Sequence, residues 1–180
     1  MLRYTLTDDA DLIELGDEHA EELFALVARN RAHLRAWLPW VDDTRTVETI
    51  DAFIARMRRE QADTGNPTMV LRLRGQLAGV IGIHPINWND RKTSLGYWLS
   101  AEYQGRGLMT RACRTMVNYA LVEERLNRVE ITAATGNGRS RAIPERLGFT
   151  HEGCLRQAQW LYDHFVDLEL YAMLREEWAG

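Results

Sequence analysis

Residues 103–110 read Y-Q-G-R-G-L-M-T, and their types and spacing suit the binding of an anion. Two glycines stand two positions apart, between an apolar run and a predicted helix. Glycine lets backbone N–H groups approach an oxygen closely, and the N-terminus of a helix adds partial positive charge. The segment therefore predicts a nest of amides for a phosphate or diphosphate, to which Arg106 adds a full charge.

The same spacing excludes two other phosphate-binding loops. The chain contains no G-x-x-x-x-G-K-[ST] motif, and its glycines do not follow the pattern G-x-G-x-x-G. On glycine content alone, an ordinary turn between a strand and a helix stays an equal alternative. The elements around the loop have to decide between the two interpretations.

In the first half of the chain, helices are predicted to precede antiparallel strands. Apolar residues spaced by three and four indicate amphipathic helices, and alternating residues indicate strands. The helices are expected from His19, at 31–38 and after the N-cap candidate Thr46, and the strands at 68–74, 77–84 and 94–99. The last of these strands, S-L-G-Y-W-L, leads directly into the glycine loop.

The second half begins with a helix from Leu108 whose apolar residues recur every four positions. Further elements are expected as a strand at 128–134, a loop and short helix at 136–147 ended by Gly148 in a left-handed cap, and strands at 155–161 and 166–173. This order predicts an α+β fold in which one mixed sheet has helices on both faces.

Length and composition limit the classes of protein that remain. A chain of 180 residues with 46% hydrophobic residues predicts one domain, 1–180. The chain has no long apolar run and no signal-like N-terminus, so we expect a cytoplasmic protein without a membrane partner. A net charge of -4 disfavours direct binding to nucleic acid and favours cationic partners such as amines. Cys113 and Cys154 lack disulfide or metal spacing and are expected to be small buried residues.

Several motifs resemble the GNAT superfamily of N-acetyltransferases. Its acetyl-CoA signature is Gln or Arg, two residues, Gly, one residue, then Gly or Ala. Residues 104–109 match this signature except that Met109 replaces the last small residue. The similarity continues through L-G-Y-W-L at 95–99, N-x-x-S at 137–140, L-G-F-x-x-E-G-C-L at 147–155 and the closing L-E-L-Y-A-M-L. It is closest to the RimJ/RimL branch, whose members acetylate the N-terminal amino group of ribosomal proteins.

The resemblance implies a place for acetyl-CoA and implies no metal. In this superfamily the mostly antiparallel sheet splays between its fourth and fifth strands, and the cofactor lies in the gap. Backbone groups of the fourth strand then bind the pantetheine, and the loop amides bind the diphosphate. Asn137, which by itself reads as a turn residue, matches a position that contacts the pantetheine. The implied cofactor-binding residues are Trp98, Leu99, Gln104, Gly105, Arg106, Gly107, Leu108, Met109, Thr110 and Asn137.

For the chemistry, the resemblance implies that Ser140 donates a proton to the departing thiolate, whereas its position also suggests a helix N-cap. Pro144 predicts that this helix begins later, near Ile143, or is kinked. Similar sequences often carry Glu where this chain has Ser94 and Gln159, and neither residue accepts a proton near pH 7. The remaining candidates for a base are His84, Glu102, Glu130, His151, Glu152, Asp163 and His164, or water.

The function expected from these features is direct transfer of acetyl from acetyl-CoA to an amine. The preferred acceptor is a protein N-terminus, with ribosomal proteins implied by the branch, and members of the branch often form homodimers. Two alternatives stay open. In the first alternative, the acceptor is a small amine such as an antibiotic, polyamine or amino acid. In the second, the chain is a CoA-binding module without turnover.

Overall fold

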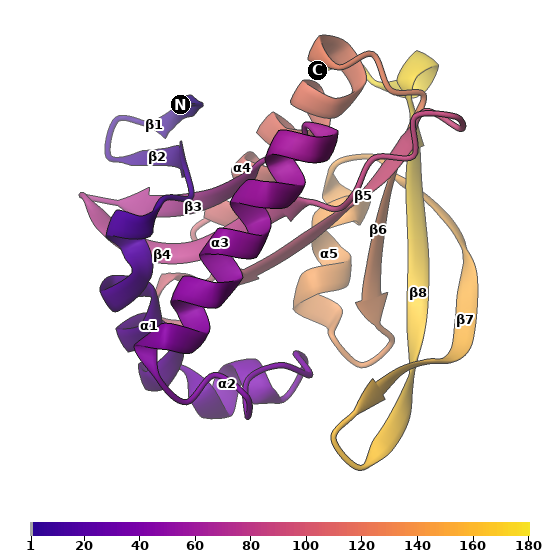
Figure 1. Cartoon of the computed structure of the whole chain (residues 1–180). Coiled ribbons are helices and arrows are strands. Elements are labelled where there is room, and N and C mark those ends of the chain that lie inside the picture. The colour runs from indigo at the N-terminus through magenta and orange to yellow at the C-terminus, as the bar shows by residue number, and fades with distance from the viewer. Residues whose placement is uncertain (1) are drawn as a thin grey trace. The chain divides into compact units, whose positions relative to one another are not determined.

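The computed structural model describes residues 2–180, which divide into two compact units. The first unit holds the residues up to Gly82 together with Tyr97–Leu108, and the second holds Ile83–Gly96 and Met109–Gly180. Within residues 2–180, eight strands follow the order β1-β2-β3-β4-β5-β6-β8-β7 (Figure 1). Most neighbours are antiparallel, and β5 and β6 form a parallel pair. The predicted α+β fold, with a mixed and mostly antiparallel sheet flanked by helices, is confirmed.

The first unit starts with a short hairpin that the sequence interpretation missed. Its elements are β1 Arg3–Thr7, β2 Ala10–Glu14, α1 Ala20–Arg29, α2 Arg31–Arg35, α3 Val47–Thr64, β3 Thr68–Leu73 and β4 Gln76–Ile83. The expectation that helices come first was wrong, because two strands precede α1 and β2 forms through its pairing with β3. It lies antiparallel to β3, from Ala10 opposite Leu73 to Glu14 opposite Met69. Five-residue strands carry little signal of their own, so this long-range pairing decides their structure.

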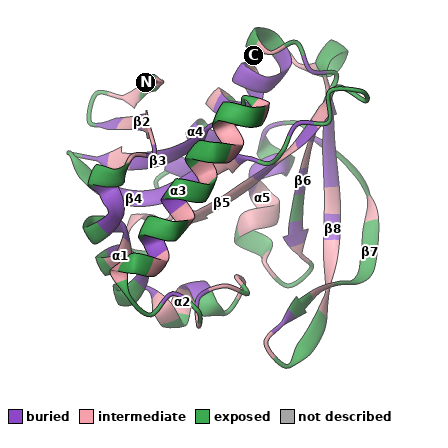
Figure 2. Cartoon of the chain, viewed as in Figure 1, coloured by how far each residue is buried: buried purple, intermediate pink, exposed green. Residues whose placement is uncertain are grey.

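The core of the first unit lies between two helices and two strands. Leu23 and Leu26 of α1 and Ile54 of α3 pack with Val70 of β3 and Val80 of β4, all almost fully buried. Burying one such side chain contributes about 1.5–3 kcal/mol to folding. Ile50 and Ile54 of α3 are buried one turn apart, and Figure 2 shows the rest of the helix mostly exposed or intermediate, as an amphipathic helix requires. The helix begins after Thr46, so the predicted N-cap position is confirmed.

The second unit carries the first part of β5 and most of the remaining elements. These are β5 Lys92–Leu99, α4 Leu108–Asn118, β6 Arg128–Ala134, α5 Gly138–Arg146, β7 Thr150–Leu161 and β8 His164–Leu174. The register of β5 and β6 pairs Lys92 with Arg128 and ends with Leu95 opposite Ile131. Beyond that last pair, β5 continues to Leu99 and β6 continues to Ala134.

Strand β7 is exposed over most of its length and stands last in the strand order (Figure 2). It begins at Thr150, five positions before the predicted start. Cys154 lies on this strand and is exposed, so its expected burial was wrong. Cys113 in α4 is fully buried, and burial raises the pKa of its thiol.

Within residues 2–180, the helices lack the combination of length and apolar character that crossing a membrane requires. The same residues hold no group of three or more His, Cys, Asp or Glu side chains arranged to bind a metal ion.

Candidate functional site

The glycine loop follows β5 in the first unit. The strand ends at Leu99, a 3-10 turn covers Ala101–Tyr103, and α4 begins at Leu108. Gly105 and Gly107 have φ angles of 75° and 72°, which side-chain-bearing residues rarely adopt. A Cβ at either glycine would meet no described atom within 4 Å, so the backbone angle is what demands glycine. Left-handed glycines just before a helix, whose first amides have no partner inside the helix, are a backbone arrangement that suits an anion.

A buried asparagine fixes the direction in which the chain leaves β5. Asn30, at the end of α1, donates from Nδ2 to the carbonyl of Leu26 at 2.9 Å. Its Oδ1 accepts the N–H of Ala101 at 2.9 Å and the hydroxyl of Ser100 at 3.1 Å. The Ser100 N–H donates to the carbonyl of Ala78 in β4 at 2.8 Å. The start of the loop is therefore anchored to α1 and β4 by hydrogen bonds of the buried residues Asn30 and Ser100.

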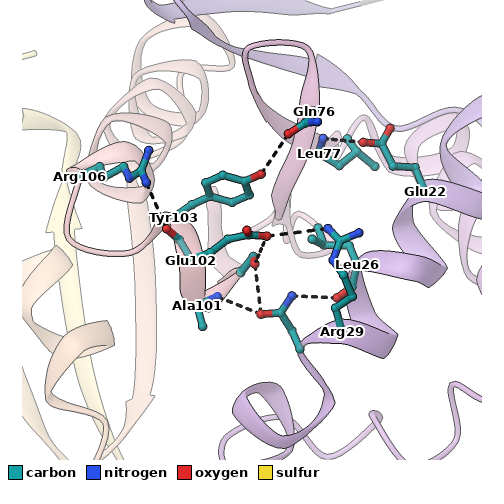
Figure 3. Close-up of polar contacts among 11 residues, drawn as sticks. Glu22, Leu26, Arg29, Gln76, Leu77, Ala101, Glu102, Tyr103 and Arg106 are labelled. Carbon is teal, nitrogen blue, oxygen red and sulfur yellow. Dashed lines mark hydrogen bonds and ion pairs between the residues drawn. The ribbon is translucent and has the colours of Figure 1, made fainter.

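Weaker contacts hold the exposed side of the loop (Figure 3). The Tyr103 hydroxyl donates to Gln76 Oε1 at 3.4 Å, and Arg106 Nη2 donates to the Glu102 carbonyl at 3.4 Å. The Arg106 guanidinium also lies 5.8 Å from the centre of the Tyr103 ring. Glu102 pairs with Arg29 at 3.8 Å across an exposed surface. Glu102 thus belongs to the support of the loop.

His33, from α2, contacts two predicted cofactor-binding residues, Leu99 at the end of β5 and Gln104 in the glycine loop. Its Nε2 lies 3.2 Å from the Leu99 carbonyl and 3.0 Å from Gln104 Nε2. A carbonyl oxygen only accepts, so a hydrogen bond to Leu99 requires a proton on Nε2, whereas a hydrogen bond from the Gln104 amide nitrogen requires a lone pair there; the tautomer decides which of the two forms. His33 and Asn30 were missed by the sequence interpretation. Each lies about 70 positions from its partners, and no local pattern marks them.

Gly79 of β4 lets the end of β5 come close. A Cβ on Gly79 would lie 2.3 Å from the carbonyl oxygen of Trp98 and 3.0 Å from Cα of Leu99. Trp98 is half-buried, and its ring centre lies 6.2 Å from that of Trp40. A lone glycine inside a strand is a sign of close backbone approach, and this signal was available in the sequence.

In the second unit, Asn137 and Ser140 meet at the start of α5. Asn137 is the N-cap, and its Oδ1 accepts the Ser140 N–H at 3.2 Å. The helix begins at Gly138 and contains Pro144, so the predicted start near Ile143 was wrong. The alternative of Ser140 as the cap was wrong as well. The side-chain cap stabilises the first turn of the helix, although Pro144 has no N–H and one backbone hydrogen bond of the helix is missing.

A polar cluster attaches this first turn to the sheet. Arg141 Nε donates to the Tyr171 hydroxyl at 3.1 Å, and its Nη1 donates to the Thr135 carbonyl at 3.0 Å. The Tyr171 hydroxyl donates to Glu145 at 2.9 Å, and burial raises the pKa of this phenol. The segment that carries Ser140 is thereby held against β8.

The predicted donor residues of α4 lie on both sides of the boundary between the units. Leu108 and Met109 are buried in the first turn of the helix. Thr110 Oγ1, in the second unit, accepts from Arg146 Nη1 at 3.0 Å. Thr110 therefore links the first turn of α4 to the last turn of α5.

Most base candidates of the second unit are engaged in ion pairs. Arg128 contacts Glu130 at 2.7 Å and Glu152 at 2.5 Å, and its hydrogen bond lowers the pKa of Glu152. His151 Nε2 lies 2.6 Å from the buried Glu169, and that contact, followed by the Thr135 hydroxyl, lowers the pKa of Glu169. Asp163 pairs with His164 at 2.6 Å. The Nδ1 of His84 lies 2.7 Å from the hydroxyl of Ser94.

Comparison with known proteins gives consistent matches. Residues 11–150 match the model of the acetyltransferase (GNAT) domain. The putative ribosomal N-acetyltransferase YdaF of Bacillus subtilis (strain 168) is 38% identical over 92% of this chain and 91% of its own length. The ribosomal-protein-serine acetyltransferase of Escherichia coli (strain K12) is 26% identical over 94% of both chains. The crystal structure of the microcin C7 self-immunity acetyltransferase MccE, in complex with acetyl-CoA and AMP, superposes with a TM-score of 0.89 over 94% of both chains at 24% identity.

Proposed function

This chain belongs to the acetyltransferase (GNAT) family, and we propose that residues 1–180 act as one domain that transfers acetyl from acetyl-CoA to the N-terminal amino group of a protein. Acetyl transfer is the activity of the family. The relatives named as ribosomal acetyltransferases support a ribosomal protein as the acceptor. The observation that carries the proposal is the pair of left-handed glycines directly before α4.

We assign the diphosphate of CoA to the backbone amides of residues 105–109. Each contact between an anion and a helix N-terminus contributes about 0.3–2 kcal/mol, so several amides together supply a useful part of the affinity. Arg106 adds a charge that solvent screens. The backbone of Trp98 and Leu99 and the side chain of Asn137 are assigned to the pantetheine. The acetyl-CoA held by MccE supports this choice of donor.

The acceptor half follows from the chemistry of a thioester. The neutral amine nitrogen attacks the carbonyl carbon, an N–C bond forms, and the C–S bond breaks. The oxyanion needs an N–H donor, which we assign to the backbone near Leu99. The thiolate needs a proton, which we assign to Ser140. The nitrogen passes its own proton to a base or to water.

A panel of acceptors tests the proposal. Purified protein and acetyl-CoA are incubated with peptides that copy ribosomal-protein N-termini, with the same peptides blocked at the N-terminus, and with polyamines, amino acids and aminoglycosides. Mass spectrometry should detect one acetyl group on free N-termini and none on blocked ones. Turnover of small amines without turnover of peptides would overturn the assigned acceptor. Binding of acetyl-CoA without any acetylated amine would overturn the assigned transfer to a protein.

A further inference from the structure

The side chain of His33 extends from the short helix α2 to the end of strand β5. Its Nε2 lies 3.2 Å from the carbonyl oxygen of Leu99 and 3.0 Å from the side-chain nitrogen of Gln104. The backbone of Leu99 is assigned to the pantetheine, and Gln104 opens the glycine loop. One imidazole nitrogen therefore stands between two parts of the assigned donor site, and all three residues belong to the first unit.

Helix α2 has only five residues, and contacts outside the helix hold it in place. Leu34 is buried and packs in a cluster with Val41. Arg31 donates from Nη1 to the carbonyl of Val41 and from Nη2 to the carbonyl of Thr44, both at 2.5 Å. Isolated helices of this length are not stable in water, so these contacts fix the position from which His33 reaches β5.

The peptide group between Leu99 and Ser100 is contacted at both of its polar atoms. Its N–H donates to the carbonyl of Ala78 in β4 at 2.8 Å, and its carbonyl oxygen faces His33. The peptide group is planar, so a hydrogen bond at each edge prevents it from rotating about the flanking Cα atoms. A bond from His33 would thus fix the backbone of Leu99.

A single nitrogen cannot make both contacts of His33. With a proton on Nε2, the ring donates to the Leu99 carbonyl, and the Gln104 side-chain nitrogen, itself a donor, cannot bond to it. With the proton on Nδ1 instead, the Nε2 lone pair accepts from Gln104, and the Leu99 carbonyl loses this donor. The two tautomers therefore hold different parts of the site.

We propose that His33 is a positioning residue for acetyl-CoA and that the bound cofactor selects its Nε2–H tautomer, an assignment that rests on the proposed function. The Nε2–H donates to the Leu99 carbonyl and holds the end of β5 for the pantetheine. A ligand favours the state that binds it better, and a strand end that is already ordered costs less entropy on binding. His33 acts through Leu99 and does not touch the cofactor.

Two substitutions at position 33 separate hydrogen-bond donation from the filling of space. Glutamine has a similar length and can donate an N–H in place of Nε2, whereas leucine donates nothing. His33→Leu should raise the Kd for acetyl-CoA about tenfold, as expected for the loss of one hydrogen bond, and His33→Gln should stay within about threefold of the wild type. Calorimetry measures both values. A rise below threefold in His33→Leu, or an equal rise in the two variants, would overturn the assignment.

A control checks that the effect belongs to position 33. His164→Leu makes the same substitution at the exposed histidine that begins β8. This variant should bind acetyl-CoA with the wild-type Kd. An equal loss of affinity in His164→Leu and His33→Leu would show that the effect does not come from the contact with Leu99.

A double-mutant cycle identifies the partner through which His33 acts. If the partner is Leu99, His33→Leu should raise the Kd by the same factor in the wild type and in Gln104→Ala. If the partner is Gln104, the factor should disappear in the Gln104→Ala background, and the proposed role would be wrong.

The tautomer itself can be observed without any substitution, so this measurement decides even if a variant at position 33 fails to fold. The ¹⁵N chemical shifts of the histidine rings are recorded at about pH 8, where imidazole is ordinarily neutral. In the wild type saturated with acetyl-CoA, the signals of His33 should show a proton on Nε2. An unprotonated Nε2 in the complex would overturn the proposal.

These experiments measure binding of the donor, so they do not depend on the acceptor. If the wild type binds acetyl-CoA and acetylates no peptide, the proposed acceptor fails, and the tests still decide the role of His33. If the wild type acetylates peptides and His33→Leu binds acetyl-CoA equally well, the proposed function stands and the role of His33 is wrong.

Discussion

The side-chain oxygen of Asn30 accepts the backbone N–H of Ala101 at 2.9 Å, although the two residues are 71 positions apart. This bond ties the end of α1 to the start of the glycine loop, and Figure 3 shows Ala101 and Leu26 held by the same amide. Asn30 is buried, and so is its second partner, Ser100. The loop that we assign to the CoA diphosphate thus depends on one asparagine in another element.

Asn30→Ala should lower both the stability and the affinity for acetyl-CoA. The change removes the acceptor of the Ala101 N–H and one of two acceptors of the buried Ser100 hydroxyl, which also donates to Glu102 at 3.3 Å. Loss of a buried hydrogen-bond partner costs about 1–3 kcal/mol, so urea unfolding should show a loss of that size, and calorimetry should show weaker acetyl-CoA binding. The matched control, Arg29→Ala, removes only an exposed ion pair and should cost less than about 1 kcal/mol. Equal effects in the two variants would contradict the anchoring role.

Gly79→Ala should weaken acetyl-CoA binding from within β4. Its methyl group would lie 2.3 Å from the Trp98 carbonyl, so the end of β5 must move. We expect at least a tenfold rise in the Kd for acetyl-CoA. Gly82→Ala, on the same strand, meets only the Thr68 side chain at 3.1 Å and should bind nearly normally. Unchanged affinity for acetyl-CoA in Gly79→Ala would show that the end of β5 takes no part in binding acetyl-CoA.

Asn137→Ala and Ser140→Ala should act on different properties. Asn137 caps α5, so its loss should cost about 1 kcal/mol of stability. Ser140 is not the cap, so Ser140→Ala should lower kcat more than it raises the KM for acetyl-CoA. Denaturant unfolding and steady-state kinetics on both variants check this division. Full activity in Ser140→Ala would show that Ser140 does not take part in the chemical step.

Glu169 should contribute to acid sensitivity. Hydrogen bonds from His151 and then Thr135 lower the pKa of its carboxyl from 4.5 in the folded protein. Because the pKa of Glu169 is lower in the folded than in the unfolded protein, its ionised carboxylate stabilises the fold fully above the pKa of the unfolded state. This stabilisation is lost as the pH falls through the pKa of the folded state. Below pH 4.5 the stability of the wild type should therefore fall more steeply than that of Glu169→Gln. An equal fall in stability with decreasing pH in the two proteins would show that Glu169 does not contribute to acid sensitivity.

Features set by local sequence were predicted correctly. The left-handed conformation of Gly148 follows from the residue itself, and so does the start of α3 after Thr46. Strand β6 has the predicted bounds because its alternation is regular. In each case, neighbours in the sequence supply the decisive interactions.

Features set by distant partners were missed. Strand β2 is defined by its pairing with β3, and Cys154 is exposed because β7 stands last in the strand order. The start of α5 was misjudged for another reason. The penalty of Pro144 was given more weight than the cap that Asn137 supplies. The supports of the loop, Asn30 and His33, have no periodic or motif signal, so the fold itself is needed to find them.

Binding of acetyl-CoA to the wild type and to Gly107→Asp tests the central claim most directly. Aspartate at 107 places a charge and a side chain at a residue with a φ of 72°, against the assigned diphosphate. Calorimetry should detect binding to the wild type, and ligand at a hundredfold excess over Kd should add about 2.7 kcal/mol to its stability. Gly107→Asp should stay folded and show neither effect. Absence of binding by the wild type, or wild-type affinity in Gly107→Asp, would contradict the account.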